Sequence, residues 1–174
     1  MIVKIFKKIN IVLLLIIFLY TSCEDRNDNE IGLYINEFMA SNSTTIADEI
    51  GEHDDWVELY NSTSDPIDIA GMYIADDLQD NLNIIPMSND DVTIVPPKGF
   101  LIIWFDSDNE QGSLHIGEKL SAEGEGIFLY NDKRTMIDSV SFGPQETDVS
   151  MGRYPDGSNR WIKFSSPTPG ATNN

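Results

Sequence analysis

Short apolar runs recur along the chain, and clusters of Gly, Pro, Asn and Asp separate them. No segment shows a sustained recurrence of apolar residues at helical spacing. Runs of this kind, rich in β-branched and aromatic residues and bounded by turn residues, are typical of β-strands. The pattern predicts strands over 33–40, 55–61, 67–71, 72–76, 82–87, 92–95, 100–105, 126–131, 136–142, 151–154 and 160–164. Many short strands at regular spacing indicate an all-β sandwich or barrel.

The run FLIIWF at 100–105 is apolar on both faces, so we expect it in the centre of a sheet. The preceding PPKG predicts a turn, in which Pro presets φ near about −65° and Gly99 accepts a positive φ. The sequence YPDGS at 154–158 predicts a second turn of this kind. We find no internal repeat and no second domain.

The N-terminus has a different composition from the rest of the chain. A basic segment (Lys4, Lys7, Lys8) precedes an unbroken apolar run from Ile11 to Tyr20, which is shorter than the roughly 20 residues of a spanning helix. The run ends close to Cys23, the one cysteine of the sequence. The arrangement resembles a bacterial lipoprotein signal, in which the cysteine is lipidated and becomes the first residue of the mature protein, although Tyr20 departs from that pattern.

We therefore expect a signal peptide over 1–22, a lipidated Cys23 with a disordered acidic tether over 23–31, and a folded domain over 32–174. The resemblance implies export and a lipid anchor in the outer membrane or at the cell surface. A short uncleaved anchor is the alternative.

The charge of the chain excludes some partners. The formal net charge is −18, and loss of the three lysines of the signal would make it −21. Such a surface repels nucleic acids and anionic lipid headgroups, so we expect no nucleic-acid binding and membrane contact through the lipid anchor alone.

An ordered series of motifs spans most of the mature chain. It comprises INEFMASN (35–42), DWVELYN (55–61), IDIAGMYIADD (67–77), IPMSNDDVTIVPPKGFLIIWFD (85–106), HIGEKLSAEGEGIFLYN (115–131), IDSVSFGPQ (137–145) and SMGRYPDGSNRWIKFSSPTPGATN (150–173). The series resembles the bacterial branch of the lamin tail domain. The resemblance implies an immunoglobulin-like β-sandwich and a binding or structural module rather than an enzyme.

An acidic loop precedes the strand at 55–61 and offers a candidate metal site. Its carboxylates are the hard oxygen donors that Ca²⁺ prefers, and Gly51 would let the chain turn so that they converge. The candidate ligands are Asp48, Glu52, Asp54 and Asp55. The spacing does not fit the EF-hand loop, and a solvated loop in an acidic protein is the simpler interpretation. A second acidic stretch at 106–112 begins like a calcium loop but lacks an acid at its twelfth position, Gly117, and an ordinary charged hairpin loop explains it.

Glu37 and Glu58 each lie within a predicted strand that is otherwise apolar. By strict alternation, Glu37 shares a face with Ile35 and Met39, and Glu58 shares one with Trp56 and Tyr60. A carboxylate on a core-facing side needs a cation or backbone donors. We expect Glu37 and Glu58 to form a structural polar pair with Arg153, because a guanidinium can satisfy a carboxylate with two parallel bonds. A catalytic pair, as in glycoside cleavage, is the alternative.

Other catalytic constellations are poorly supported. His53 and His115 could serve Ser121 or Ser139 as a base, but no GxSxG elbow is present. One cysteine and two distant histidines do not supply a zinc site. We therefore predict that the protein is not an enzyme.

Aromatic residues offer a further alternative. An exposed set could stack on sugars: Trp56, Tyr60, Tyr73, Trp104, Tyr154 and Trp161. We expect Trp104 in the core and Trp161 partly exposed. The sequence thus predicts a surface-anchored module that binds a protein or polysaccharide, by strand addition or through its loops. An accessory glycan-binding or hydrolase-associated unit and a calcium-dependent adhesion domain are the alternatives.

Overall fold

The computed structural model describes residues 31–77, 82–85, 91–108 and 110–173. Every regular element in that part of the chain is a β-strand. The strands are β1 (Leu33–Met39), β2 (Asp55–Asn61), β3 (Ile67–Asp68), β4 (Tyr73–Ala75), β5 (Asn83–Ile84), β6 (Ile94–Val95), β7 (Phe100–Phe105), β8 (His115–Ile116), β9 (Glu125–Tyr130), β10 (Met136–Phe142), β11 (Ser150–Arg153) and β12 (Trp161–Phe164). The predicted signal peptide, Cys23 and almost all of the predicted tether lie outside the described residues.

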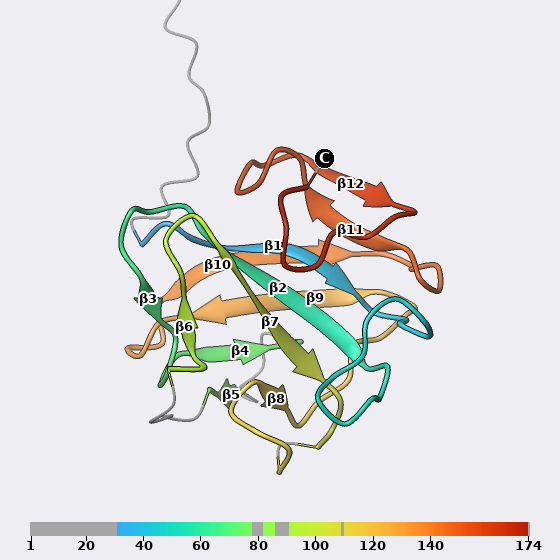
Figure 1. Cartoon of the computed structure of the whole chain (residues 1–174), viewed down its shortest axis with the longest axis horizontal. Coiled ribbons are helices and arrows are strands. Elements are labelled where there is room, and N and C mark those ends of the chain that lie inside the picture. Colours follow the sequence, from blue (N-terminus) through green and yellow to red (C-terminus); the bar gives the residue numbers. More distant parts are fainter. Residues whose placement is uncertain (1–30, 78–81, 86–90, 109, 174) are drawn as a thin grey trace, which may run out of the picture.

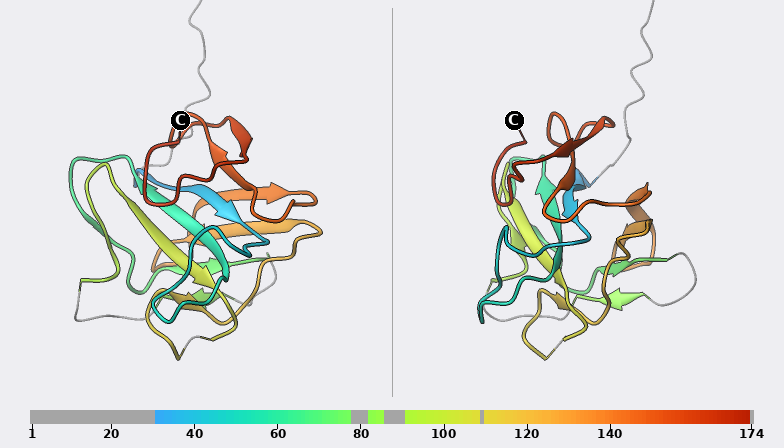
Figure 2. Two further views of the ribbon diagram at one scale, coloured as in Figure 1. Left: turned by 45° about the vertical axis from the view of Figure 1, so that its right-hand side comes forward. Right: turned by 90° about the vertical axis from the view of Figure 1, so that its right-hand side faces the viewer.

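The strands form a β-sandwich, as the sequence predicts. A six-stranded sheet has the order β12-β11-β1-β2-β7-β8, and a four-stranded sheet has the order β10-β9-β4-β5. The two sheets lie face to face, with β1, β2 and β7 in one layer and β4, β9 and β10 in the other (Figures 1 and 2). Strands β3 and β6 pair separately at one side of the sandwich (Figure 1).

The main core fills the space between the sheets. Both sheets contribute alternate aliphatic side chains to it, such as Val57 and Ile103 from the large sheet and Ile74 and Leu129 from the small one, all with no exposed surface. Since side chains alternate along a strand, the large sheet has an outer face as well. There Met39, Trp56 and Trp104 form a second buried cluster.

A bulge in β1 decides which of its residues face the core. The pairing with β2 runs Ile35 to Leu59 and then Glu37 to Glu58, so Asn36 is the extra residue. An extra residue reverses the alternation beyond it. Ile35 and Phe38 both enter the main core, whereas Glu37 faces outward with Met39. The prediction that Glu37 shares a face with Ile35 is therefore wrong, because strict alternation does not hold across a bulge.

The longest predicted strands are confirmed, and the short ones differ. The predictions over 55–61, 100–105 and 136–142 match β2, β7 and β10, and β7 lies inside the large sheet as expected. The sequence pattern does not predict β8, a two-residue strand that runs parallel to β7. The prediction that 106–112 is a hairpin loop is therefore wrong. A hairpin joins antiparallel strands, whereas this stretch lies between two parallel strands, β7 and β8.

The turn before β7 forms where expected but uses its residues differently. The positive φ falls on Lys98, at 54°, not on Gly99. Glycine is required at 99 for space, since a Cβ there would lie 2.6 Å from Pro96 Cγ.

Candidate functional site

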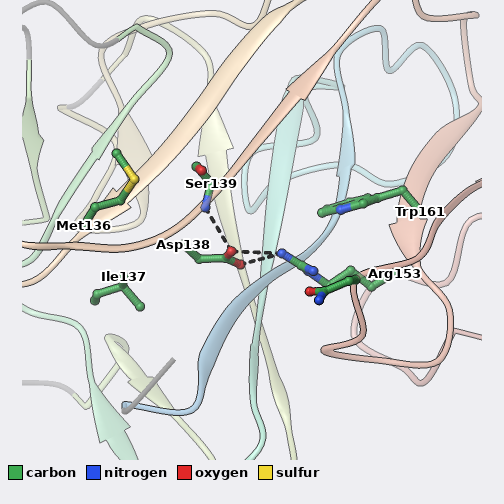
Figure 3. A pocket seen from close by; sticks show the side chains of 7 residues that line it. Met136, Ile137, Asp138, Ser139, Arg153 and Trp161 are labelled. Atoms are coloured by element: carbon green, nitrogen blue, oxygen red, sulfur yellow. Dashed lines mark hydrogen bonds and ion pairs between the residues drawn. The ribbon is translucent and has the colours of Figure 1, made fainter. Parts of the chain in front are cut away.

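A groove opens where the end strands of the two sheets approach each other. β10 ends the small sheet, and the β11–β12 hairpin ends the large one. Between them lies a pocket of about 380 Å³, lined by Met136, Ile137, Asp138 and Ser139 of β10 and by Arg153, Asn159 and Trp161 of the hairpin (Figure 3). We call this pocket the edge groove.

A buried ion pair forms the floor of the edge groove. Arg153 Nη2 donates to both carboxylate oxygens of Asp138 at 2.9 Å (Figure 3), and both side chains are almost fully buried. Arg153 also donates from Nε to the carbonyl of Ile35 and from Nη1 to that of Ser158. Asp138 in turn accepts the backbone N–H of Ile35. Burial raises the pKa of Asp138, and the Arg153 charge opposes that rise. The network joins β1, β10 and β11, and therefore ties the two sheets together.

Aromatic rings flank the guanidinium of Arg153. Its Cζ lies 4.7 Å from the ring centre of Trp161 and 5.7 Å from that of Tyr34. Trp161 is half-buried, as expected, and Trp104 is buried in the second cluster. One wall of the edge groove is therefore a tryptophan held in place by a buried arginine.

The predicted polar pair of Glu37 and Glu58 with Arg153 is wrong. In the β1–β11 register Glu37 lies opposite Gly152, so the neighbouring Arg153 points to the other face of the sheet. On that side of the large sheet lies β10 of the small sheet, and its Asp138 pairs with Arg153 instead.

Glu37 and Glu58 lie side by side on the outer face of the large sheet, beneath the C-terminal segment. Glu37 accepts hydrogen bonds from Ser150 Oγ at 2.5 Å and from the N–H and hydroxyl of Thr168. Glu58 accepts from Asn36 Nδ2 at 3.1 Å and from Gly170 N–H at 2.5 Å. Burial raises the pKa of Glu37, and it raises the pKa of Glu58 to about 8. Both residues have no exposed surface, so the arrangement supports a structural role and gives no access for a substrate.

The acidic loop brings three of the four predicted metal ligands together. Ligand oxygens of Asp48, Glu52 and Asp54 all lie within 4.8 Å of one another. Asp48 Oδ1 accepts the N–H groups of residues 50, 51 and 52, which holds the loop closed. Asp55 is not part of the group. It accepts backbone N–H groups of Asn42 and Leu120, and burial raises its pKa to about 6.

His115 forms a second cluster beside this loop, which the sequence pattern does not predict. Its Nδ1 contacts Asp106 Oδ2, and its Nε2 lies 3.2 Å from Glu49 Oε2. Burial lowers the pKa of His115, but the hydrogen bonds and charges of Asp106 and Glu49 outweigh that effect and raise it. These contacts join residues up to 66 positions apart, so no local pattern announces them.

A serine–histidine arrangement is not formed in the described part of the chain. His53 Nδ1 contacts the carbonyl of Ile46 at 2.8 Å, and His115 is held between its two carboxylates. Neither ring makes a hydrogen bond to a serine hydroxyl among the described residues.

Comparison with known families agrees with the fold. A model of the Lamin Tail Domain matches residues 27–144. The chain belongs to the lamin tail domain family. This family is immunoglobulin-like and non-catalytic, and its members are often binding modules. No curated protein matches the chain, and no solved structure does. Within the lamin tail domain match lie β1 to β10 with Asp138 and His115, whereas Arg153 and Trp161 follow it. No helix in the described residues is long and apolar enough to cross a membrane.

Proposed function

We propose that this lamin tail domain is a non-enzymatic binding module of the outer membrane or cell surface, which holds an extended segment of a protein or polymer along β10. The observation that carries the proposal is the edge groove beside the open edge of β10. In the described part of the chain, β10 is paired on one side with β9 and forms no ladder on its other side.

An open strand edge is a ready template for another extended chain. Its backbone N–H and C=O groups supply affinity, and neighbouring pockets read alternate side chains of the added strand. In the edge groove those pockets are bounded by the Trp161 ring, the aliphatic Ile137 and the half-exposed Met136. The Arg153–Asp138 pair beneath them is already satisfied, so the groove is rigid rather than reactive.

The proposed location is supported by the sequence alone. The lipoprotein-like segment around Cys23 would moor the domain to a membrane by a fatty chain, and the polar tether would hold it clear of the lipid surface.

Crosslinking on intact cells tests this proposal. The full-length chain is compared with Met136→Lys, which places a charge at the edge groove, and with Ile84→Lys, a matched change of an exposed apolar residue on β5 at the other end of the same sheet. We expect a crosslinked partner that Met136→Lys loses and Ile84→Lys keeps. Equal capture by all three chains would refute the edge groove as the binding surface. Recovery of polysaccharide in place of protein would favour the glycan-binding alternative.

The anchor is tested separately with Cys23→Ala. We expect this variant to leave the membrane fraction while the purified protein still binds its partner. Unchanged membrane association would show that the chain is not held by a lipid on Cys23.

A further inference from the structure

We propose that His115, Glu49 and Asp48 form a binding site for one divalent transition-metal ion of the zinc class. The site is separate from the edge groove and does not rest on the function proposed for it. It lies where β8 meets the loop at 47–55.

The orientation of His115 is the first argument. Its imidazole is 3% exposed, and Nδ1 is held by Asp106, whose side chain is 2% exposed. Contact of a carboxylate with one ring nitrogen fixes the ring and directs the other nitrogen outward, which is the usual environment of a metal-binding histidine. Here the other nitrogen, Nε2, lies 3.2 Å from Glu49 Oε2 on the loop.

The spacing of the ligand atoms is the second argument. One ligand atom each of His115, Glu49 and Asp48 lies within 4.8 Å of the other two. Zinc holds nitrogen and oxygen at about 2.0–2.2 Å, so two ligands of a tetrahedral ion lie roughly 3.3 Å apart. His115 Nε2 and Glu49 Oε2 are 3.2 Å apart, so an ion could enter with small side-chain shifts.

The third argument is the lack of a donor for a buried oxygen of Asp48. Its Oδ2 has almost no exposed surface and accepts no hydrogen bond from the described residues. A buried carboxylate oxygen without a donor costs free energy, which a cation offsets.

The mixed set of ligands selects the class of metal. An imidazole nitrogen with carboxylates suits zinc and its neighbours, whereas Ca²⁺ takes six to eight oxygens. The site therefore shares Asp48 with the calcium set expected from the sequence, but it uses His115 and Glu49 in place of the other three acids of that set.

The site is also accessible. His115 and Glu49 line a pocket of about 380 Å³ together with Ile50, Val92, Gln111 and Leu114. The side of the ion not bound by protein would face this pocket, where water or a partner's side chain could complete the coordination.

Titration calorimetry with Zn²⁺, Mn²⁺ and Ca²⁺ on the full-length chain in detergent tests the site. We expect one Zn²⁺ per chain, at least 10-fold weaker binding in Glu49→Gln and loss of binding in His115→Gln. Glu123→Gln, which removes an exposed acid elsewhere, and His53→Gln should bind as the wild type does. Replacement of zinc by Co²⁺ should give visible absorption that depends on His115.

Circular dichroism checks that each variant is folded. Glu49 carries much of the test, because its side chain is 70% exposed and its replacement should leave the fold intact. The proposal is overturned if folded Glu49→Gln and His115→Gln variants keep the wild-type Zn²⁺ affinity. It is also overturned if Ca²⁺ binds as tightly as Zn²⁺ and depends on Glu52 and Asp54 alone.

Discussion

The two faces of the large sheet treat buried carboxylates in opposite ways. On the inner face, Asp138 is paired with Arg153 by two hydrogen bonds and stays within reach of a full positive charge. On the outer face, Glu37 and Glu58 lie opposite each other with neutral donors alone, and burial raises the pKa of both. Burial raises the pKa of all three acids, but only Asp138, which projects from β10 of the small sheet, has a cation that opposes the rise. The inner pair should therefore be sensitive to loss of its partner, and the outer acids should be sensitive to pH.

Loss of Arg153 should have the largest effect. Arg153→Met leaves Asp138 buried without its cation, and removal of one partner of a buried pair costs about 3–5 kcal/mol. Denaturant unfolding would measure this loss. Arg153→Met combined with Asp138→Leu should lose less than the single variant, because no unpaired charge is then buried. A single variant as stable as the wild type would show that the pair does not tie the sheets together.

The outer acids should make stability fall as pH rises. The pKa of Glu58 is about 8 in the folded state, above its ordinary value near 4.5, so the folded protein binds the proton more tightly. The stabilisation is complete below about pH 4.5 and is lost as pH rises through 8. We expect a loss of roughly 3 kcal/mol between pH 5 and pH 8 from this residue, at about 1.4 kcal/mol per pKa unit.

Unfolding free energies measured from pH 5 to pH 9 would test this. Glu58→Gln should flatten the slope, whereas Glu123→Gln, an exposed acid, should leave it unchanged. Parallel slopes in the wild type and Glu58→Gln would contradict a raised pKa for Glu58.

Crowding above the outer acids should give a smaller effect. A Cβ on Gly152 would lie 2.6 Å from Asn173 Nδ2 and 3.2 Å from Glu37 Cγ. Gly152→Ala should therefore cost about 1–3 kcal/mol through overpacking. Gly143→Ala is the matched control, because nothing lies within 4 Å of its added Cβ. Thermal unfolding would distinguish the two variants. Equal midpoints would show that the C-terminal segment can move to accommodate the added Cβ without loss of stability.

Removal of a single donor should give the smallest effect. Thr168 donates its hydroxyl to Glu37 Oε2 at 2.8 Å. Thr168→Val keeps the shape and removes this bond, and we expect a loss of about 1 kcal/mol at pH 7. Thr168→Ser should restore most of it. If Thr168→Val and Thr168→Ser unfold at the same denaturant concentration, the hydroxyl does not support Glu37.

The sequence predicted the sandwich well because its evidence is local or ordered along the chain. Strands such as 55–61 and 100–105 carry their own pattern, and the motif series matches the lamin tail domain. The contacts of the sites depend instead on register and on which face a residue takes. The bulge at Asn36 places Glu37 on the opposite face from Ile35. The β1–β11 register places Arg153 on the face that meets Asp138. The contacts of His115 with Asp106 and Glu49 were not predicted, because its two-residue strand is too short to show a pattern and Glu49 lies 66 positions away.

Because Asn36 is an extra residue in β1, this strand contributes side chains to two buried regions. Ile35 and Phe38 enter the main core, and Glu37 and Met39 are buried on the outer face of the large sheet. A strand built this way tolerates loss of the bulged residue better than a change in length elsewhere. Deletion of Asn36 would restore strict alternation and leave Phe38 inside and Glu37 outside, at the cost of the hydrogen bonds of Asn36 to Glu58 and Asp156. In comparisons between relatives, a one-residue gap in this strand should therefore fall at the bulge, because a gap elsewhere would exchange the two faces of the residues beyond it.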